Sequence, residues 1–395
     1  MRPSRGLAAG WLALLGALLV AVPLLLRLLP AGLGTLFLIE FLSDGRVPAL
    51  TTLTAPPHEE TVRLASGPAT LYRPLAPGRR PGLVLLHGLV PEGKDDPRLV
   101  WAAGLLARGG FAVLVPDLPG LRASRLRPAD AEVVIRAVET LAAEPGVRAD
   151  RTALVGISVG AGPALLAAAD PRIADRIGLV ATLGGYADAR ELVRYFTTGH
   201  YGFGEVRGRR VLDPELVRAF LRLNLDLIPD EEDRQALGAL LEGRPLPHRL
   251  GPEGRAVAAL LANRDPARVD ALLEALPAAI RELLAELSPV SRLHRIRARL
   301  LLLHGRDDPA IPFTESLRLA AAAGPARTRL VLLSLIGHVD PAETSWWGVT
   351  AELFRLWGAA YELFRSRPLP RSSRGDDEAE GGTGRWESPG ASLSR

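Results

Sequence analysis

A serine lies between two glycines in the sequence GISVG, which runs from Gly156 to Gly160. The apolar run that ends at this serine (Thr152 to Ser158) predicts a buried strand, and the run behind it (Val159 to Ala169) predicts a helix. A serine on such a strand-to-helix turn has a strained backbone and an exposed hydroxyl, and flanking glycines let the neighbouring backbone pass. The pattern therefore predicts that Ser158 is a nucleophile for acyl transfer.

A serine hydroxyl is a poor nucleophile unless an imidazole takes its proton, and a carboxylate must hold that imidazole in the right tautomer. Of the seven histidines, only His338 lies in a loop just after the last predicted strand, so we expect it to be the general base. His87 and His304 also end predicted strands, but both lie upstream of where the base is expected. We interpret these two as packed or turn-bonded structural histidines.

The carboxylate candidates lie in two segments. GRDDPAIP, from Gly305 to Pro312, follows the penultimate predicted strand and contains two adjacent aspartates. We favour Asp308, which directly precedes the Pro-x-Ile-Pro segment, over Asp307, which is placed to cap the turn. Asp340, close to the predicted base, is a weaker alternative.

The elements that must position these residues alternate between short apolar runs and helical patterns, as expected for a mostly parallel sheet flanked by helices. A hairpin with its turn at Gly67-Pro68 comes first. The predicted strands are Gly82 to Gly88, Phe111 to Gly120, Thr152 to Ser158, Ile177 to Gly185, Arg299 to Gly305 and Arg329 to Leu335. Between residues 186 and 297 we expect only short helices, with N-caps at Asp213, Asp230 and Asp265.

With these motifs in this order, the chain resembles an α/β-hydrolase over roughly Pro57 to Phe364. The motifs that match are LLHG (Leu85 to Gly88), PDLPG (Pro116 to Gly120), GISVG, GRDDPAIP and GHVD (Gly337 to Asp340). The resemblance implies an α/β-hydrolase fold with a helical lid over residues 186–297, inserted before the strand that bears the acid. It also implies Ser158 as nucleophile, Asp308 as orienting carboxylate and His338 as base.

The same resemblance implies an oxyanion hole made by the backbone N–H groups of Val159 and Leu89. The loop after His87-Gly88 continues as LVPEGKDD, without the glycine cluster of HGGG-type lipases and esterases. Within the superfamily, the segment AAEPGVRADRTALVGISVGAG is similar to the dienelactone-hydrolase and prolyl-oligopeptidase-like branches. Dienelactone hydrolases proper use a cysteine, and this chain has none.

The N-terminal part contains a membrane-anchor candidate. Residues 7–26 form an uncharged apolar run, and 20 helical residues span a hydrocarbon core about 30 Å thick. A cleaved signal peptide is the alternative, but the run is long and no clean A-x-A site closes it. Arg2 and Arg5 before the run favour a single-pass anchor with the catalytic domain on the extracytoplasmic side. We therefore divide the chain into an anchor and linker (1–49), an α/β-hydrolase domain (50–366) and a disordered tail (367–395).

Composition narrows the functions that remain. The 395 residues carry a net charge of +4 with no strongly basic window, which gives no indication of nucleic acid as a partner. Neither clustered metal ligands nor a glycine-rich phosphate loop is present in the sequence, so no cofactor is implied. We expect a serine hydrolase of the carboxylesterase kind acting on a small-molecule ester, and the anchor and leucine-rich insertion point to a lipophilic one. A peptidase, a thioesterase, a cofactor-free haloperoxidase or an inactive scaffold with this fold are the alternatives.

Overall fold

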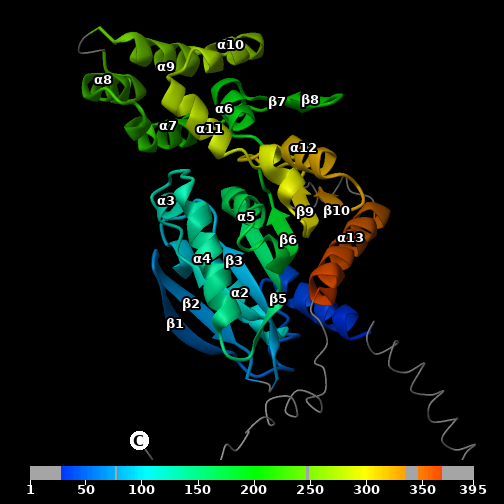
Figure 1. The fold of residues 1–395 in the computed structure, drawn as a ribbon. Helices are drawn as coiled ribbons and strands as arrows, with labels where there is room; N and C mark the ends of the chain where they lie inside the picture. Colours follow the sequence, from blue (N-terminus) through cyan, green and yellow to red (C-terminus); the bar gives the residue numbers. More distant parts are fainter. Residues whose placement is uncertain (1–27, 76–77, 246–248, 335–345, 367–395) are drawn as a thin grey trace, which may run out of the picture.

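The central feature of the computed structural model is an eight-stranded sheet with helices on both faces (Figure 1). The structure describes residues 28–75, 78–245, 249–334 and 346–366. The strand order is β1-β2-β4-β3-β5-β6-β9-β10; β2 pairs antiparallel with both β1 and β4, and every other neighbouring pair is parallel. The strands are β1 (His58–Leu64), β2 (Gly67–Arg73), β3 (Arg80–Leu86), β4 (Ala112–Pro116), β5 (Val147–Ile157), β6 (Ile177–Leu183), β9 (Arg299–Gly305) and β10 (Thr328–Leu333).

The structure confirms the predicted α/β-hydrolase fold, since each predicted parallel strand is a strand of the sheet. The hairpin differs from its prediction by a small shift: Leu64 pairs with Gly67, so the turn lies at residues 65–66. Gly67 adopts a φ of 138°, which excludes a side chain at the point where β2 begins.

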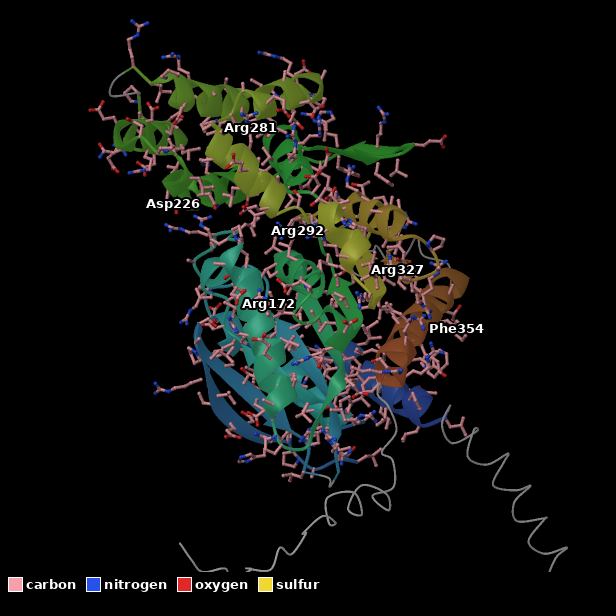
Figure 2. All side chains as sticks on the ribbon, in the orientation of Figure 1. Arg172, Asp226, Arg281, Arg292, Arg327 and Phe354 are labelled. Carbon is pink, nitrogen blue, oxygen red and sulfur yellow. The ribbon has the colours of Figure 1, made fainter. Side chains whose placement is uncertain are left out.

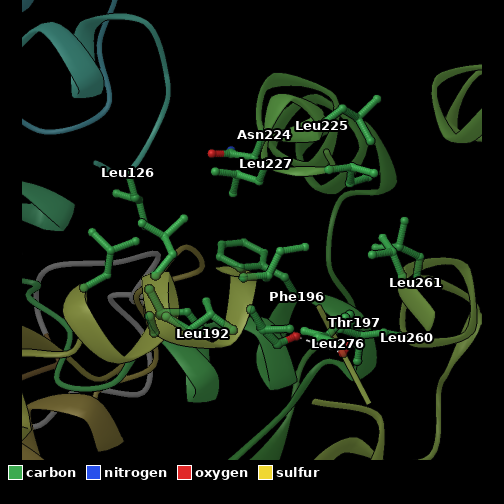
Figure 3. Close-up of a pocket in the computed structure, with 18 residues that line it drawn as sticks. Leu126, Leu192, Phe196, Thr197, Asn224, Leu225, Leu227, Leu260, Leu261 and Leu276 are labelled. Atoms are coloured by element: carbon green, nitrogen blue, oxygen red, sulfur yellow. Dashed lines mark hydrogen bonds between the residues drawn. The ribbon is translucent and has the colours of Figure 1, made fainter. Parts of the chain in front are cut away.

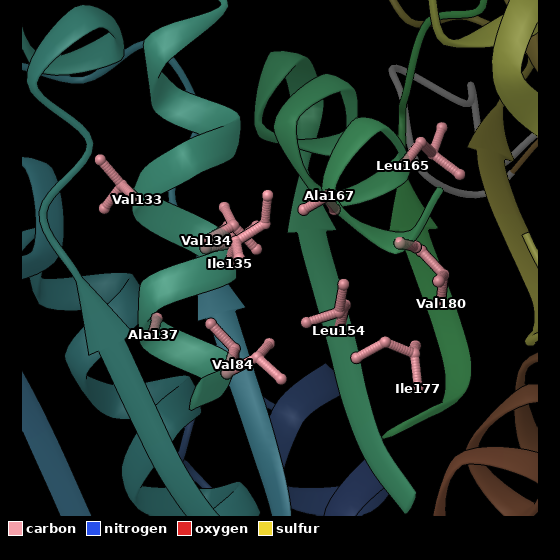
Figure 4. Close-up of a cluster of buried hydrophobic side chains, with 14 of the residues drawn as sticks. Val84, Val133, Val134, Ile135, Ala137, Leu154, Leu165, Ala167, Ile177 and Val180 are labelled. Carbon is pink, nitrogen blue, oxygen red and sulfur yellow. The ribbon is translucent and has the colours of Figure 1, made fainter. Parts of the chain in front are cut away.

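Each face of the sheet has its own hydrophobic core. On one face, α4 (Ala129–Ala143) and α5 (Ala161–Ala168) pack against inward-pointing strand residues such as Val84, Leu154 and Val180 (Figure 4). On the other face, α2 (Pro97–Arg108) and α13 (Trp346–Arg365) cover the alternate residues of the same strands, including Leu83 and Val155. The strands are apolar on both sides because both faces are covered.

Residues 28–42 form a helix that packs on the second of these faces. Phe37 lies against Phe364 of α13 with ring centroids 5.6 Å apart, and Phe41 stacks on Trp101 of α2 at 5.4 Å. The sequence pattern places residues 28–42 in the anchor and linker, whereas in the structure this helix packs with α2 and α13 against the sheet. The run at residues 7–26 and the tail at 367–395 lie outside the described residues. Among those that are described, no helix is long and apolar enough to cross a bilayer.

The insertion after β6 forms a separate layer over the carboxyl edge of the sheet (Figure 1). Its elements are α6 (Ala189–Thr198), β7 (His200–Phe203), β8 (Val206–Arg209), α7 (Pro214–Leu223), α8 (Glu231–Leu241), α9 (Pro252–Ala262), α10 (Val269–Glu274) and α11 (Ala278–Glu286). Asp230 caps α8 through the backbone N–H of Asp233 at 2.8 Å, as predicted. The β7–β8 hairpin is a difference, because only helices were expected there.

The two ends of the insertion are pinned together in what we call the neck, residues 186–189 and 287–290. Tyr186 donates its hydroxyl to the carbonyl of Leu287 at 3.0 Å, and the N–H of Val290 donates to the carbonyl of Ala187 at 3.0 Å. The Ser288 hydroxyl accepts from the N–H of Ala189 at 3.0 Å. The chain therefore enters and leaves the insertion at one fixed place.

Glu315 of α12 (Thr314–Ala323) ties the neck to the sheet. One carboxylate oxygen accepts from the backbone N–H groups of Ala187 and Asp188, at 3.0 and 2.9 Å. Burial raises the pKa of Glu315 to about 7, since desolvation outweighs these hydrogen bonds.

This pKa predicts a dependence of stability on pH. Between the ordinary value of 4.5 and about 7 the folded protein holds a proton that the unfolded chain has lost, so the free energy of unfolding falls as pH rises through that window. In Glu315→Gln, which retains an acceptor oxygen, this loss of about 3 kcal/mol should be absent. Denaturant unfolding at pH values on either side of the window measures the difference. The exposed Glu282→Gln serves as control and should keep the wild-type slope; parallel curves for wild type and Glu315→Gln would contradict the prediction.

Candidate active site

Ser158 lies where the chain leaves β5 and begins the helical turn that leads into α5. Its φ is 53°, in the left-handed region that side chains other than glycine rarely adopt. Within the described residues only Asp44 and Ser124 share this property among non-glycines. The side chain is half-buried and lines a cavity, so the strain has the consequence expected of a nucleophile turn: the hydroxyl is presented above the carboxyl edge of the sheet.

The glycines around Ser158 are required by close backbone approaches. A Cβ on Gly160 would lie 2.2 Å from the carbonyl oxygen of His87, and one on Gly156 would lie 2.6 Å from the Cα of Ala161. A Cβ on Gly88 would lie 3.2 Å from the Cβ of Ser158. The ends of β3 and β5 are therefore in direct contact, and any added methyl group would push them apart.

The backbone N–H groups predicted to form the oxyanion hole lie on either side of this contact. Val159 follows Ser158 at the first turn of the helix, where N–H groups lack intrahelical acceptors and the helix dipole favours negative charge. Leu89 follows Gly88, and its N–H has no acceptor among the described residues. Both residues line the same cavity as Ser158.

His87 fixes the loop that carries Leu89. Its Nε2 accepts from the backbone N–H of Leu118 at 3.0 Å, so its Nδ1 carries the proton and donates to the carbonyl of Gly88 at 2.8 Å. Burial lowers the pKa of His87, which keeps the ring neutral. This arrangement agrees with the structural role that the sequence suggested for His87.

Asp117 holds the rest of that loop in place. Its carboxylate accepts from the N–H of Lys94 at 3.3 Å and from the guanidinium of Arg122 at 2.6 Å. Gly93 has a φ of 59°, and a Cβ there would lie 2.1 Å from the Asp117 carboxylate. The loop lacks a glycine cluster, yet its path is fixed by the PDLPG segment that the resemblance singled out.

Asp308 lies at the end of β9, two strands from Ser158. Its Oδ1 accepts from the N–H groups of Ala310 and Ile311 at 2.9 and 3.0 Å, which fixes the orientation of the carboxylate. Its Oδ2 has no hydrogen-bond donor among the described residues, since the nearest imidazole nitrogen, Nε2 of His304, is 3.6 Å away. Gly184, with a φ of 66°, follows β6, and a Cβ on it would lie 2.9 Å from Oδ2. One oxygen of Asp308 is thus available at the carboxyl edge of the sheet.

The neighbouring carboxylate is placed differently. The Asp307 side chain is 55% exposed, and its Oδ1 lies 3.5 Å from the guanidinium of Arg210, a residue that also binds the carbonyl of Arg306. Asp307 therefore points to the surface of the insertion rather than toward Ser158, which supports the choice of Asp308.

His338 and Asp340 lie outside the described residues, so their positions are not part of the geometry. The strand that precedes them is described: Leu333 of β10 pairs with Gly305 of β9, and the N–H of Ser334 donates to the carboxylate of Glu352 at 2.9 Å. Because β10 is parallel to β9, the segment after Ser334 begins at the same edge of the sheet as Asp308.

Both ring nitrogens of His304 have hydrogen-bond partners within the domain. Its Nε2 donates to the carbonyl of Ile311 at 2.9 Å, and its Nδ1 accepts from the hydroxyl of Ser316 at 2.7 Å. Burial lowers the pKa of His304. Both ring nitrogens are thereby used in holding the loop that carries Asp308, in agreement with the predicted structural role.

Ser158, Val159 and Leu89 open into a cavity of about 800 Å³ between the sheet and the insertion. Its described walls are largely apolar, and its ionisable side chains besides His87 are Asp44, Asp96 and Arg98. Asp96 is committed to capping α2 and to Arg98 at 2.8 Å. Across residues 28–75, 78–245, 249–334 and 346–366, no three His, Asp or Glu side chains converge as a metal site requires.

Several residues that line this cavity were not predicted from the sequence. Leu126 comes from the loop before α4, Leu192 and Phe196 come from α6, and Phe41 and Trp101 come from the stacked pair on the other face. Their types are those of ordinary core residues, and only the tertiary fold brings them to the nucleophile.

A second contact holds the insertion over the cavity. Asp226 of the insertion, which is labelled in Figure 2, accepts from Arg127 at 2.7 and 2.8 Å and from Arg125 at 3.1 Å. Arg127 also donates to the side-chain oxygen of Asn224 at 3.1 Å. These bonds place the segment around Asp226 directly against the loop that carries Leu126.

The contrast between the adjacent aspartates gives a test of the acid. Asp308→Asn keeps an oxygen for the N–H groups of Ala310 and Ile311 but removes the charge that stabilises an imidazolium, so kcat should fall by about 10⁴-fold with little change in melting temperature. Asp307→Asn is the matched control, and its kcat should stay close to that of the wild type. Hydrolysis of an activated ester measures both, and equal losses in the two variants would reject the assignment.

One family model and a number of solved structures match this chain. A model described as the alpha/beta hydrolase family matches residues 83–365, and no curated protein matches the chain. Among solved structures, Pyrococcus horikoshii acylaminoacyl peptidase is 14% identical, with a TM-score of 0.47 over 84% of this chain and 45% of its own. A Mycobacterium tuberculosis puromycin-hydrolyzing peptidase is 18% identical, with a TM-score of 0.43 over 79% and 38%. A 2,6-dihydroxy-pseudo-oxynicotine hydrolase is 17% identical, with a TM-score of 0.43 over 81% and 72%.

This chain therefore spans less than half the length of the two peptidases it matches. The family model covers well over half of the sequence and includes Ser158, Asp308 and His338. The chain belongs to the alpha/beta hydrolase family.

Proposed function

We propose that this protein is a serine hydrolase that cleaves a carboxylic ester through a Ser158-His338-Asp308 triad. The observation that carries the proposal is the strained turn at Ser158, which lines one cavity together with Val159 and Leu89. The helix, loop and strand before the nucleophile support a place in the dienelactone-hydrolase and prolyl-oligopeptidase-like branches, with serine in place of cysteine.

The reaction proceeds in two halves. His338 takes the proton of Ser158 as its Oγ attacks the ester carbonyl, and the N–H groups of Val159 and Leu89 bind the oxyanion. The alcohol leaves with the proton from His338, and the acyl group stays on Ser158. Water then gives a proton to His338 and attacks the acyl-enzyme, and the collapse of the second oxyanion releases the carboxylic acid and restores Ser158. Asp308 holds the imidazole and stabilises its charge through Oδ2.

An ester is favoured over a peptide by the character of the cavity. Of the ionisable groups on its described walls besides His87, Asp96 and Arg98 bind each other, and the remaining one, Asp44, is exposed. A site that selects charged peptide termini needs unpaired charges to bind them. A mostly apolar wall around the nucleophile suits an uncharged acyl group instead.

The proposal predicts covalent labelling at one residue. A fluorophosphonate probe should modify wild-type protein at Ser158, and Ser158→Ala should lose both the label and ester hydrolysis. His338→Ala should lose both as well, since the hydroxyl then has no base. Ser291→Ala, at an exposed position in the segment Pro289–Arg295, is the control and should behave as wild type. Folded protein that neither takes the label nor cleaves esters would support the inactive scaffold, and cleavage of peptide amides alone would support a peptidase.

We also propose that residues 7–26 anchor the protein in a membrane as a single span, with the catalytic domain on the extracytoplasmic side. The uncharged run and the arginines before it support this proposal. The helix at residues 28–42 adds a physical link, because it joins the run directly to the packed domain.

The anchor predicts how the protein fractionates. The full chain should stay in the membrane pellet after an alkaline carbonate wash, and protease added to spheroplasts or intact vesicles of known orientation should reach the catalytic domain. A variant that lacks residues 7–26 should be released. Recovery of the full chain in the wash would count against an anchor, and a shortened mature chain would indicate a cleaved signal peptide.

A further inference from the structure

A second, smaller cavity lies inside the insertion, next to the one that contains Ser158. Its volume is about 140 Å³, and it is lined by α6, α9 and α11 and by residues 224–228 (Figure 3). Three residues line both cavities: Leu126, Leu192 and Phe196. The two spaces are therefore neighbours that share these three residues in their walls.

The walls of this smaller cavity, which we call the lid pocket, carry no charge. Sixteen of its eighteen described lining residues are apolar, and the exceptions are Thr197 and Asn224. The Thr197 hydroxyl donates to the carbonyl of Val193 at 2.8 Å, and the Asn224 oxygen accepts from Arg127. A polar ligand group would lose its hydrogen bonds to water in such a pocket and gain few in return, so the wall suits a hydrocarbon group.

The pocket has room for a short hydrocarbon segment. A dry cavity of about 150 Å³ lined by leucine, isoleucine and phenylalanine binds benzene in another protein, so this pocket should take roughly six carbon atoms. Its lining is of the same kind, with leucines from α6, α9, α11 and the segment 224–228, and with Leu276 from the connection between α10 and α11.

Phe196 stands at the boundary between the two spaces. Its ring is half-buried, and in Figure 3 it lies between Leu126 on one side and Leu260 and Leu261 on the other. Leu126 is held in turn by the Arg127–Asp226 contact beside it. Phe196 therefore lies in the wall that the pocket shares with the cavity of the nucleophile.

We propose that the lid pocket is the subsite for the far end of an unbranched aliphatic acyl chain whose carbonyl is at Ser158. This inference rests on the proposed ester hydrolysis and specifies its substrate as an ester of a medium-chain fatty acid. The chain runs from the oxyanion hole past Leu126, Leu192 and Phe196 and ends among the leucines of the insertion.

The test is a series of p-nitrophenyl esters from acetate to decanoate, assayed with wild type and two variants. In wild type, kcat/KM should rise by up to about fourfold for each buried methylene and then level off once the pocket is filled. Val257→Phe places a ring into the pocket from α9, so it should abolish this rise and leave acetate hydrolysis intact. Ala259→Phe adds the same ring on the exposed side of α9 and should match the wild type.

A complementary variant keeps the test valid if Val257→Phe fails to fold. Ile280→Ala enlarges the pocket from α11 and should move the preferred chain to a longer ester. A kcat/KM that does not change from acetate to decanoate in wild type, or an unchanged chain-length preference in both pocket variants, would overturn the subsite. Failure of the proposed function is distinct, because wild type would then cleave no ester of any length.

Discussion

The structure depends on a single steric constraint, the close contact between the ends of β3 and β5. At this point the carbonyl of His87 and the Cα of Gly160 approach so closely that no side chain fits between them. The contact lies directly beside Ser158 with its left-handed conformation, and it brings Leu89 to the same cavity. The nucleophile and the two residues proposed for the oxyanion hole are thus held beside one cavity by backbone packing.

The carboxylate side of the site is built differently. Asp308 is positioned by hydrogen bonds to its own loop, and His304 fixes that loop through both ring nitrogens. Burial disfavours the charged form of this histidine, so it is a neutral residue with a structural role. The two histidines that end strands, His87 and His304, thus support opposite halves of the site, and neither is free to act as its base.

The parallel strands and the turn at Ser158 could be predicted from the sequence because local residue patterns encode them. Apolar runs predicted the parallel strands because both faces of the sheet are covered, and GISVG predicted the turn at Ser158 because only that spacing relieves the steric contact. The β7–β8 hairpin was missed because strands of four residues, half-buried in β7 and with two exposed arginines in β8, show no clear period. The lid pocket was missed for another reason: Leu126, Val257 and Ile280 are far apart in the chain, and each reads as an ordinary core residue.

The neck between Tyr186 and Val290 has an evolutionary consequence. Entry and exit of the insertion are held by bonds among the neck residues themselves, while small hydrophobic clusters around Leu237 and Leu273 give the insertion cores of its own. The clusters around Leu237 and Leu273 contain no residue of the sheet or of the turn at Ser158. Insertions of different size and sequence can therefore be joined to the same sheet at the neck, and the turn at Ser158 stays outside the exchanged segment.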